Sequence, residues 1–403
     1  MKKFRNLFVI AIAAICVVAL CSCSKCNKNQ GSGNNGGDTT KTVIKIGSSG
    51  PLSGSASIYG QAVEKGVKLA IAEINANGGV DVNGTKMTFE LVDFVNDEAD
   101  ATQAGAALTA LVAKKADIIV GAVTSGATEG LINEAIKVGI PVITPTGTAD
   151  KLTVGEDGND RENRYNIFRA CFYDSYQGKY MAEYAKKAGK TKAYVLYNND
   201  DDYSVGLKDA FEATAKSLGL AVTTAGYGKD VRDFNSYWDP ILTGGYDCVY
   251  LPDYYENVYN ILKTGYGKGY NGICYGGDGW DGVVQQIKTG DNVDFLENCF
   301  YTNHYFGLSD NEVVKNFVQK YQEANNGEVP VSFAALGYDA VYIAKQAIEA
   351  AGSVDYDAVV DALTTGSFTG LVTSSSEFKF VNGNPEKAAT VITFKDGKEV
   401  EAK

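Results

Sequence analysis

The chain has 403 residues and a formal net charge of −12, with 45% hydrophobic and 21% charged residues. This balance is typical of a folded globular protein, and the length predicts two lobes of ordinary domain size. The acidic charge argues against a nucleic acid partner, because phosphates would be repelled.

The first 22 residues have the pattern of an export signal. A basic start, MKKFR, precedes the apolar run LFVIAIAAICVVAL, which is shorter than the ~20 residues that span a bilayer. The letters LCSC that follow resemble the lipobox of bacterial lipoproteins and make Cys23 the predicted lipidation site. A plain secretory signal rich in cysteine is the alternative. Residues 23–41, rich in Gly, Asn, Ser and Thr, predict a flexible tether.

Four cysteines lie beyond the tether, at Cys171, Cys248, Cys274 and Cys299. None belongs to a C-x-x-C pair, so a zinc site is not expected. Export would permit a disulfide, and buried free thiols are the other interpretation.

From Thr42 onward, short apolar runs alternate with longer amphipathic ones. Runs rich in β-branched residues predict strands, and apolar residues at helical spacing predict helices. The expected elements are strand 42–47, helix 59–77, strand 87–94, helix 100–114, strand 116–121, helix 125–137 and strand 140–145. Strand followed by helix, repeated, predicts parallel strands joined by crossover helices in an α/β fold.

A second series of the same kind begins near Asn166 and predicts a second doubly wound sheet. Its expected elements are strand 166–170, helix 176–188, strand 192–198, helix 204–218, strand 220–227, helix 235–242, strand 246–252, helix 256–263 and strands 272–277 and 299–306. Helices 311–325, 332–350 and 356–363 and a strand at 390–394 complete the chain.

Two loops of the first series offer groups that bind an anion. Ligands of open parallel sheets bind beyond the carboxyl ends of the strands. The loop GAVTSGATEG opens a helix at Ser125, whose hydroxyl and first-turn N–H groups suit a carboxylate, although a simple N-cap is the alternative. The next loop, TPTGTADKLT, adds Thr146 and Thr148, for which an ordinary turn is the alternative.

In the second series, the segment CYGGDGWDG holds Asp278 between glycines at a strand end. Glycines allow the backbone to approach a ligand closely, so Asp278 is a candidate ligand residue, with a turn as the alternative. Trp280, two residues after Asp278, is a candidate pocket wall, and so is Tyr254, which follows the end of the predicted strand 246–252.

The segment IKIGSSGPLSGSASIYGQAVEKGVKLAIAEINANGGV resembles the opening of the Leu/Ile/Val-binding protein family, the type I periplasmic solute-binding proteins of branched-chain amino acid ABC transporters. The segments GAVTSGAT, VITPTGT, RACFYDSYQG and NNDDDYSVGL match the family too, and the resemblance extends to about Phe394. It implies two Rossmann-like, doubly wound lobes joined by a three-segment hinge, which close on a free amino acid. The expected lobes are 42–172 with 305–374, and 173–304 with 375–403.

The resemblance also implies the roles of individual residues. Ser125 matches the serine that holds the ligand carboxylate, and Thr146 matches a main-chain contact that is commonly Ala or Ser in the family. Thr148 and Asp278 match the positions near the ligand ammonium. The chemistry agrees, because a zwitterion needs donors at one end and a negative charge at the other. The residues that match aromatic positions of the cleft are Tyr59, Tyr203, Tyr254 and Phe333.

An enzyme is disfavoured by the sequence. The single histidine, His304, has no nucleophile partner in a recognisable pattern, and neither a P-loop nor a dinucleotide motif follows the first strand. The acidic letters NNDDDY lack the glycine of a calcium loop, so neither metal nor cofactor is expected.

We therefore expect a monomeric, lipid-anchored extracytoplasmic protein that delivers an amino acid to an ABC permease and its ATPase subunits. A sensor that presents the same ligand to a receptor is the alternative, and an enzyme comes third. Which amino acid is bound depends on the shape of the pocket.

Overall fold

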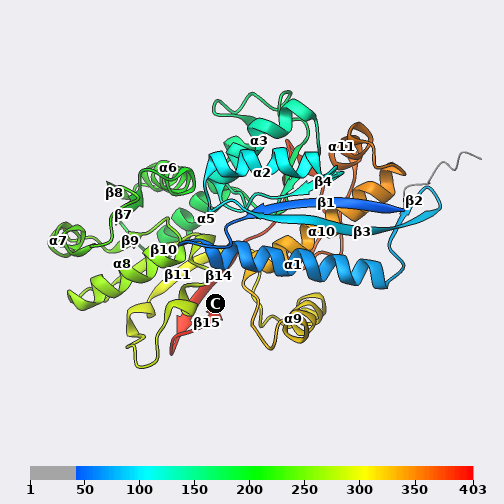
Figure 1. Cartoon of the computed structure of the whole chain (residues 1–403). Helices are drawn as coiled ribbons and strands as arrows, with labels where there is room; N and C mark the ends of the chain where they lie inside the picture. Colours follow the sequence, from blue (N-terminus) through cyan, green and yellow to red (C-terminus); the bar gives the residue numbers. More distant parts are fainter. Residues whose placement is uncertain (1–41, 403) are drawn as a thin grey trace, which may run out of the picture. The chain divides into compact units, whose positions relative to one another are not determined.

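The computed structural model describes residues 42–402, which contain two large β-sheets with helices on both faces (Figure 1). The predicted export signal, the tether and the lipidation site Cys23 lie outside the described residues. Within residues 42–402, no helix is long and apolar enough to cross a bilayer.

The first sheet has six strands in the order β2-β3-β1-β4-β5-β6. All neighbours are parallel except β2 and β3, which form an antiparallel hairpin. The strands are β1 (Val43–Gly50), β2 (Val80–Val82), β3 (Thr85–Asn96), β4 (Ile118–Val120), β5 (Val142–Thr144) and β6 (Ile167–Arg169).

Helices cover both faces of this sheet because alternate residues of each strand point to opposite sides. On β4, Ile118 and Val120 belong to the core that includes α1 and α10, whereas Ile119 packs with α2 and α3. Figure 1 shows α1 and α2 on opposite sides of β1 and β3. The helices of this part are α1 (Ser57–Ala76), α2 (Ala101–Ala113), α3 (Ser125–Val138), α4 (Lys151–Val154), α9 (Glu312–Ala324), α10 (Ser332–Ala351) and α11 (Tyr356–Thr365).

The second sheet has seven strands in the order β15-β14-β11-β10-β9-β7-β8. Its neighbours are parallel from β8 to β11, whereas β14 and β15 add an antiparallel edge. The strands are β7 (Lys192–Asn198), β8 (Ala221–Tyr227), β9 (Cys248–Tyr250), β10 (Ile273–Gly276), β11 (Cys299–Asn303), β14 (Thr390–Lys395) and β15 (Lys398–Glu401).

Two helices pack on each face of the second sheet, because its side chains also alternate between the two faces. On β7, Ala193 and Val195 pack with α5 and α6, whereas Tyr194 and Leu196 face the core of α7 and α8. These helices are α5 (Asp174–Lys187), α6 (Asp202–Ser217), α7 (Asn235–Thr243) and α8 (Tyr255–Gly267). Short 3-10 turns and a small hairpin complete the described part, namely η1 (Asp278–Trp280), η2 (Val283–Gln286), η3 (Asp294–Leu296), β12 (Phe380–Val381) and β13 (Asn384–Pro385).

The chain passes between the two sheets three times, after β6, after β11 and between α11 and β14. The expected α/β fold with two doubly wound sheets and a three-segment connection is thus confirmed. The structure adds short elements that the sequence did not predict, namely β2, α4, β12, β13 and β15, and several bounds differ. The end of β11 is an example, because this strand ends at Asn303 and not at residue 306. The N–H of His304 bonds to the side chain of Asn303, which takes the backbone out of the strand pairing.

The four cysteines at 171, 248, 274 and 299 are buried free thiols in the structure. Of the two interpretations left open by the sequence, the structure therefore has the free thiols. Burial raises the pKa of the Cys171 thiol to about 12, so this thiol is a packing group and a poor nucleophile at neutral pH.

Candidate functional site

Loops from the carboxyl ends of strands in both sheets meet around one small cavity. The loops after β4 and β5 reach it from the first sheet, and those after β9 and β10 reach it from the second. Eight of the nine predicted ligand residues line this cavity. The lining residues are Tyr59, Val123, Thr124, Ser125, Thr146, Thr148, Tyr203, Tyr254, Asp278, Gly279 and Phe333.

The cavity is almost filled by its own side chains. Its volume is about 10 Å³, close to the minimum that holds one water molecule. Contacts across it join the two sheets, since the hydroxyl of Tyr59 on α1 donates to the carbonyl of Gly279 and accepts from the N–H of Tyr255 at 3.2 Å. Lys151 Nζ lies 3.0 Å from Asp202 Oδ1 in a second contact of this kind. The conformation is therefore a closed one, and a ligand of amino-acid size requires the loops to move apart.

The glycines around Asp278 are required by close packing. A Cβ atom on Gly276 would lie 2.0 Å from the indole of Trp280, and one on Gly277 would lie 2.8 Å from the hydroxyl of Tyr203. A Cβ on Gly279 would meet the same hydroxyl at 2.8 Å. The glycines thus let the loop wrap around Tyr203 and bring Asp278 to the cavity.

Asp278 is 2% exposed and accepts hydrogen bonds on both carboxylate oxygens. Oδ1 accepts from Tyr203 Oη at 2.8 Å and from Gln177 Nε2 at 3.0 Å. Oδ2 lies 2.9 Å from Nε2 of His304. Among the described residues, no Lys or Arg forms an ion pair with Asp278, so its charge has no strong cation beside it.

The side-chain amide of Gln177 on α5 holds the loop of Asp278 through hydrogen bonds. Its amide oxygen accepts from the N–H of Asp278 at 3.1 Å and from Thr302 Oγ1 at 2.9 Å, which orients the amide. Its amide nitrogen also donates to Asp174 Oδ1 at 3.2 Å. Burial, with Asp150 and Asp278 nearby, raises the pKa of Asp174 well above its ordinary value. Of these acids, Asp278 is the one that lines the cavity.

Ser125 lies on the other side of the cavity as the first residue of α3. Its hydroxyl oxygen accepts from the N–H of Ala149 at 3.2 Å, which leaves the hydroxyl hydrogen free to donate. The first-turn N–H groups of a helix have no partner within the helix, and the positive end of its dipole favours an anion. This side of the cavity is therefore electropositive, opposite Asp278.

The two threonines have different surroundings. Thr146 Oγ1 donates to the carbonyl of Val123 at 2.6 Å, so its hydroxyl joins the two loops of the first sheet. The carbonyl of Thr148 accepts from the N–H of Asp174 at 3.0 Å, and its side chain lies near the Asp174 carboxyl, whose pKa it lowers against the larger effect of burial. Thr146 thus offers its main chain to the cavity, and Thr148 offers a hydroxyl near the acidic side.

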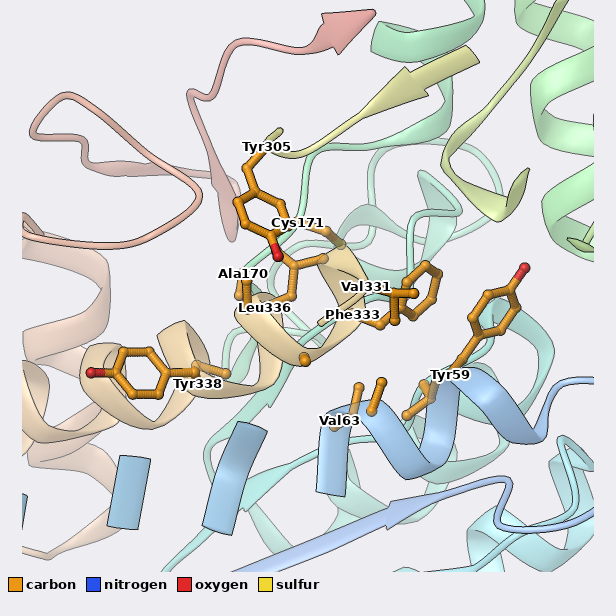
Figure 2. Packing of buried hydrophobic residues seen from close by; sticks show 14 of the residues in the cluster. Tyr59, Val63, Ala170, Cys171, Tyr305, Val331, Phe333, Leu336 and Tyr338 are labelled. Atoms are coloured by element: carbon orange, nitrogen blue, oxygen red, sulfur yellow. The ribbon is translucent and has the colours of Figure 1, made fainter. Parts of the chain in front are cut away.

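Aromatic rings form the remaining walls. Tyr59 and Phe333 stack with centroids 4.0 Å apart, and Figure 2 shows these two side chains next to one another on α1 and α10. Tyr203 and Tyr254 stack at 4.9 Å, and Tyr254 meets the edge of Tyr59 at 5.6 Å. The walls are therefore largely apolar between the two polar ends.

Trp280 does not line the cavity, contrary to the prediction. Its indole is fully buried, donates to the carbonyl of Leu251 at 2.8 Å and stacks on Tyr301 at 6.0 Å. The η1 turn sends Trp280 into the core while Asp278 faces the cavity. Asp281 is also buried and accepts from the N–H of Ser332 at 2.6 Å, so it caps the start of α10.

Sequence reasoning missed His304 and Gln177 as neighbours of Asp278. His304 follows β11, which ends at the same edge of the sheet as β10, so its position at a strand end was an available signal. Gln177 lies within α5, where no sequence pattern distinguishes it from a packing residue.

This chain matches one protein-family model and is similar to curated proteins and to solved structures. The model described as periplasmic binding protein matches residues 43–399. A leucine-binding protein of Thermotoga maritima is 27% identical, with a TM-score of 0.79 over 89% of this chain and 98% of its own. A branched-chain amino acid transporter substrate-binding protein of Streptococcus pneumoniae, solved in complex with isoleucine, is 30% identical, with a TM-score of 0.78 over 89% and 100%.

Among curated relatives, Leu/Ile/Val-binding protein homolog 3 of Brucella melitensis is 27% identical over 321 residues, 79% of this chain and 82% of the relative. Both the sequence match and the structural match extend over the two sheets and the cavity between their loops. The chain therefore belongs to the periplasmic binding protein family.

Proposed function

We propose that this protein is the extracytoplasmic solute-binding component of an ABC transporter and captures an amino acid with an apolar side chain. It binds its ligand and catalyses no reaction. The ligand carboxylate lies at Ser125 and the start of α3, and the ligand ammonium lies at Thr148 and Asp278. The aromatic walls formed by Tyr59, Phe333 and Tyr254 cover the ligand side chain.

The observation that carries this proposal is the unpaired acid in the cavity. A buried carboxylate without a cation is costly. Among the described residues, the side chains that bond to the carboxylate of Asp278 are a hydroxyl, an amide and an imidazole. A ligand ammonium supplies the missing charge. Aromatic or aliphatic acids without an amino group would leave Asp278 unpaired and would add a second negative charge to the cavity.

The family relatives support the same ligand class. The Streptococcus pneumoniae protein holds isoleucine, and the Thermotoga maritima and Brucella melitensis proteins are named for leucine or for leucine, isoleucine and valine. A binding protein that encloses its ligand between two lobes requires an open and a closed state. Separation of the two lobes would break the contacts of Tyr59 with Gly279 and Tyr255.

The remaining sequence predictions form part of this proposal. We propose lobes at 42–172 with 305–374 and at 173–304 with 375–403. Each strand of the two large sheets falls in the lobe proposed for its sheet, whereas the hairpin of β12 and β13 packs against β6 of the first sheet. A lipid on Cys23 tethers the protein to the membrane, and the protein works as a monomer beside its permease and ATPase subunits.

Calorimetry of the purified protein with L-leucine, L-isoleucine and L-valine tests the ligand class. We expect at least one of them to bind, and the leucine analogue that lacks the amino group to bind far more weakly. Truncating one partner of a buried charge pair costs about 2–5 kcal/mol, so Asp278→Asn should weaken binding by about 30-fold or more.

A matched control for this variant is Asp233→Asn, because Asp233 is an exposed carboxylate outside the cavity. We expect it to bind like the unmodified protein. Equal affinity of Asp278→Asn and Asp233→Asn, or tighter binding of the analogue without an amino group, would contradict the proposed ammonium site.

A further inference from the structure

His304 is placed to control the charge of the proposed site. It follows β11 directly, its side chain is 0% exposed, and its ring stacks on Phe172 with centroids 3.7 Å apart. Nε2 lies 2.9 Å from Oδ2 of Asp278, whereas Tyr203 and Gln177 donate to Oδ1. His304 is therefore the one described side chain that bonds to Oδ2.

The hydrogen bond determines which nitrogen carries the proton. A carboxylate oxygen only accepts, so the hydrogen lies on Nε2 of His304. Nδ1 has no hydrogen-bond partner among the described residues. In this tautomer the imidazole is neutral, and Asp278 keeps its whole negative charge while its Oδ2 atom is held in place.

An ionised carboxylate offers about four acceptor sites, and Asp278 uses three of them for Tyr203, Gln177 and His304. One site thus remains for a ligand donor. The charge and the free acceptor site together match a ligand with one ammonium group.

We propose that His304 is a positioning residue that makes the site selective for ligands with a single positive charge, and that protonation of His304 removes this selectivity. This inference rests on the proposed function. Once Nδ1 is protonated, the imidazolium neutralises Asp278 from within the protein and competes with the ligand ammonium. His304 then takes the role that the ligand would have.

The charged groups that face His304 shift its pKa in opposite directions. Asp278 and Asp281 lie on the η1 side, and Lys387 approaches from the segment before β14. Burial is the main cause that lowers the pKa of His304 below its ordinary value, and Asp278 opposes this effect. The neutral form consequently prevails at neutral pH, and the competing form appears only under acidic conditions.

The lowered pKa of His304 determines how ligand affinity changes with pH. Affinity for an amine ligand is highest above the pKa of His304 and falls as the pH drops through it, by up to about tenfold per pH unit. A ligand that pairs with Asp278 lowers the pKa of His304 further, because it competes with the imidazolium for the same carboxylate.

His304 is the only histidine in the chain, so the imidazole signals in a nitrogen NMR spectrum belong to it and report its tautomer and its pKa. The protein is prepared with an affinity tag that contains no histidine. We expect the Nε2–H tautomer in the ligand-free protein, and a lower pKa of His304 in Asp278→Asn, since the favourable charge is lost. The Nδ1–H tautomer, or an unchanged pKa in Asp278→Asn, would overturn the inference.

Calorimetry with L-leucine from neutral pH to about pH 5 provides the second test. His304→Gln keeps an N–H donor near the position of Nε2 but does not titrate, and His304→Phe keeps the stack on Phe172 without a donor. We expect His304→Phe to bind more weakly than His304→Gln at neutral pH, and His304→Gln to lose the acid-dependent decrease. The same acid-dependent decrease in His304→Gln as in the unmodified protein would refute the role of His304.

The two proposals fail in distinguishable ways. If no amino acid binds the unmodified protein at neutral pH, the proposed ligand class is wrong, while the NMR experiment still decides the state of His304. If L-leucine binds and the His304 variants behave alike at every pH, the proposed function stands and the inference about His304 is wrong.

Discussion

The hydroxyl of Tyr59 connects the two sheets, and its removal should open the protein. Tyr59→Phe leaves the carbonyl of Gly279 and the N–H of Tyr255 without their shared partner in the closed state. Leaving a buried polar group unsatisfied costs about 1–3 kcal/mol. The two groups together should shift the open–closed equilibrium by about 2 kcal/mol or more, which corresponds to roughly 30-fold.

Small-angle scattering of the ligand-free protein and calorimetry with L-leucine would measure this shift. Tyr59→Phe should increase the radius of gyration and weaken binding. Tyr250→Phe is the matched control, because the Tyr250 hydroxyl is fully buried and has no hydrogen-bond partner among residues 42–402. The reasoning is refuted if the two variants give the same scattering and the same affinity.

Three other predictions concern stability and the cavity wall. Gly66→Ala should lower the melting temperature, because its Cβ would lie 2.0 Å from the carbonyl of Ala334 on α10, whereas Gly267→Ala meets no atom within 4 Å and should be neutral or stabilising. Burial raises the pKa of Asp253 to about 8, so the folded protein favours the protonated carboxyl. The free energy of unfolding should therefore fall as the pH rises from about 4 to 8. Chemical denaturation should show that Asp253→Asn, which does not titrate, becomes increasingly more stable than the unmodified protein across that range. Trp280→Phe should lower the melting temperature through loss of its indole hydrogen bond but leave the affinity for L-leucine unchanged in calorimetry, and a large loss of affinity would place Trp280 in the cavity after all.

Local sequence patterns predicted most of the helices and strands, because the residues that determine one turn or one strand are close together in the sequence. Ser125 is the first residue of α3, as predicted from the point where the apolar run of the strand gives way to apolar residues at helical spacing. Asp100, the first residue of the predicted helix 100–114, caps α2 by accepting a 2.9 Å bond from the N–H of Gln103. The end of β11 was placed three residues too late, because apolar and aromatic letters continue past Asn303 while the backbone turns away.

The sequence by itself determined the order of the main strands and helices, the loops at the carboxyl ends of these strands and, through family motifs, eight of the residues that meet at the cavity. Only the tertiary structure decided which groups surround Asp278. Gln177 and His304 lie 101 and 26 residues away from it along the chain, and their contacts arise from the packing of α5 and the pairing of β10 with β11. Trp280, two positions from Asp278, points into the core instead, because neighbours in one tight turn project in different directions.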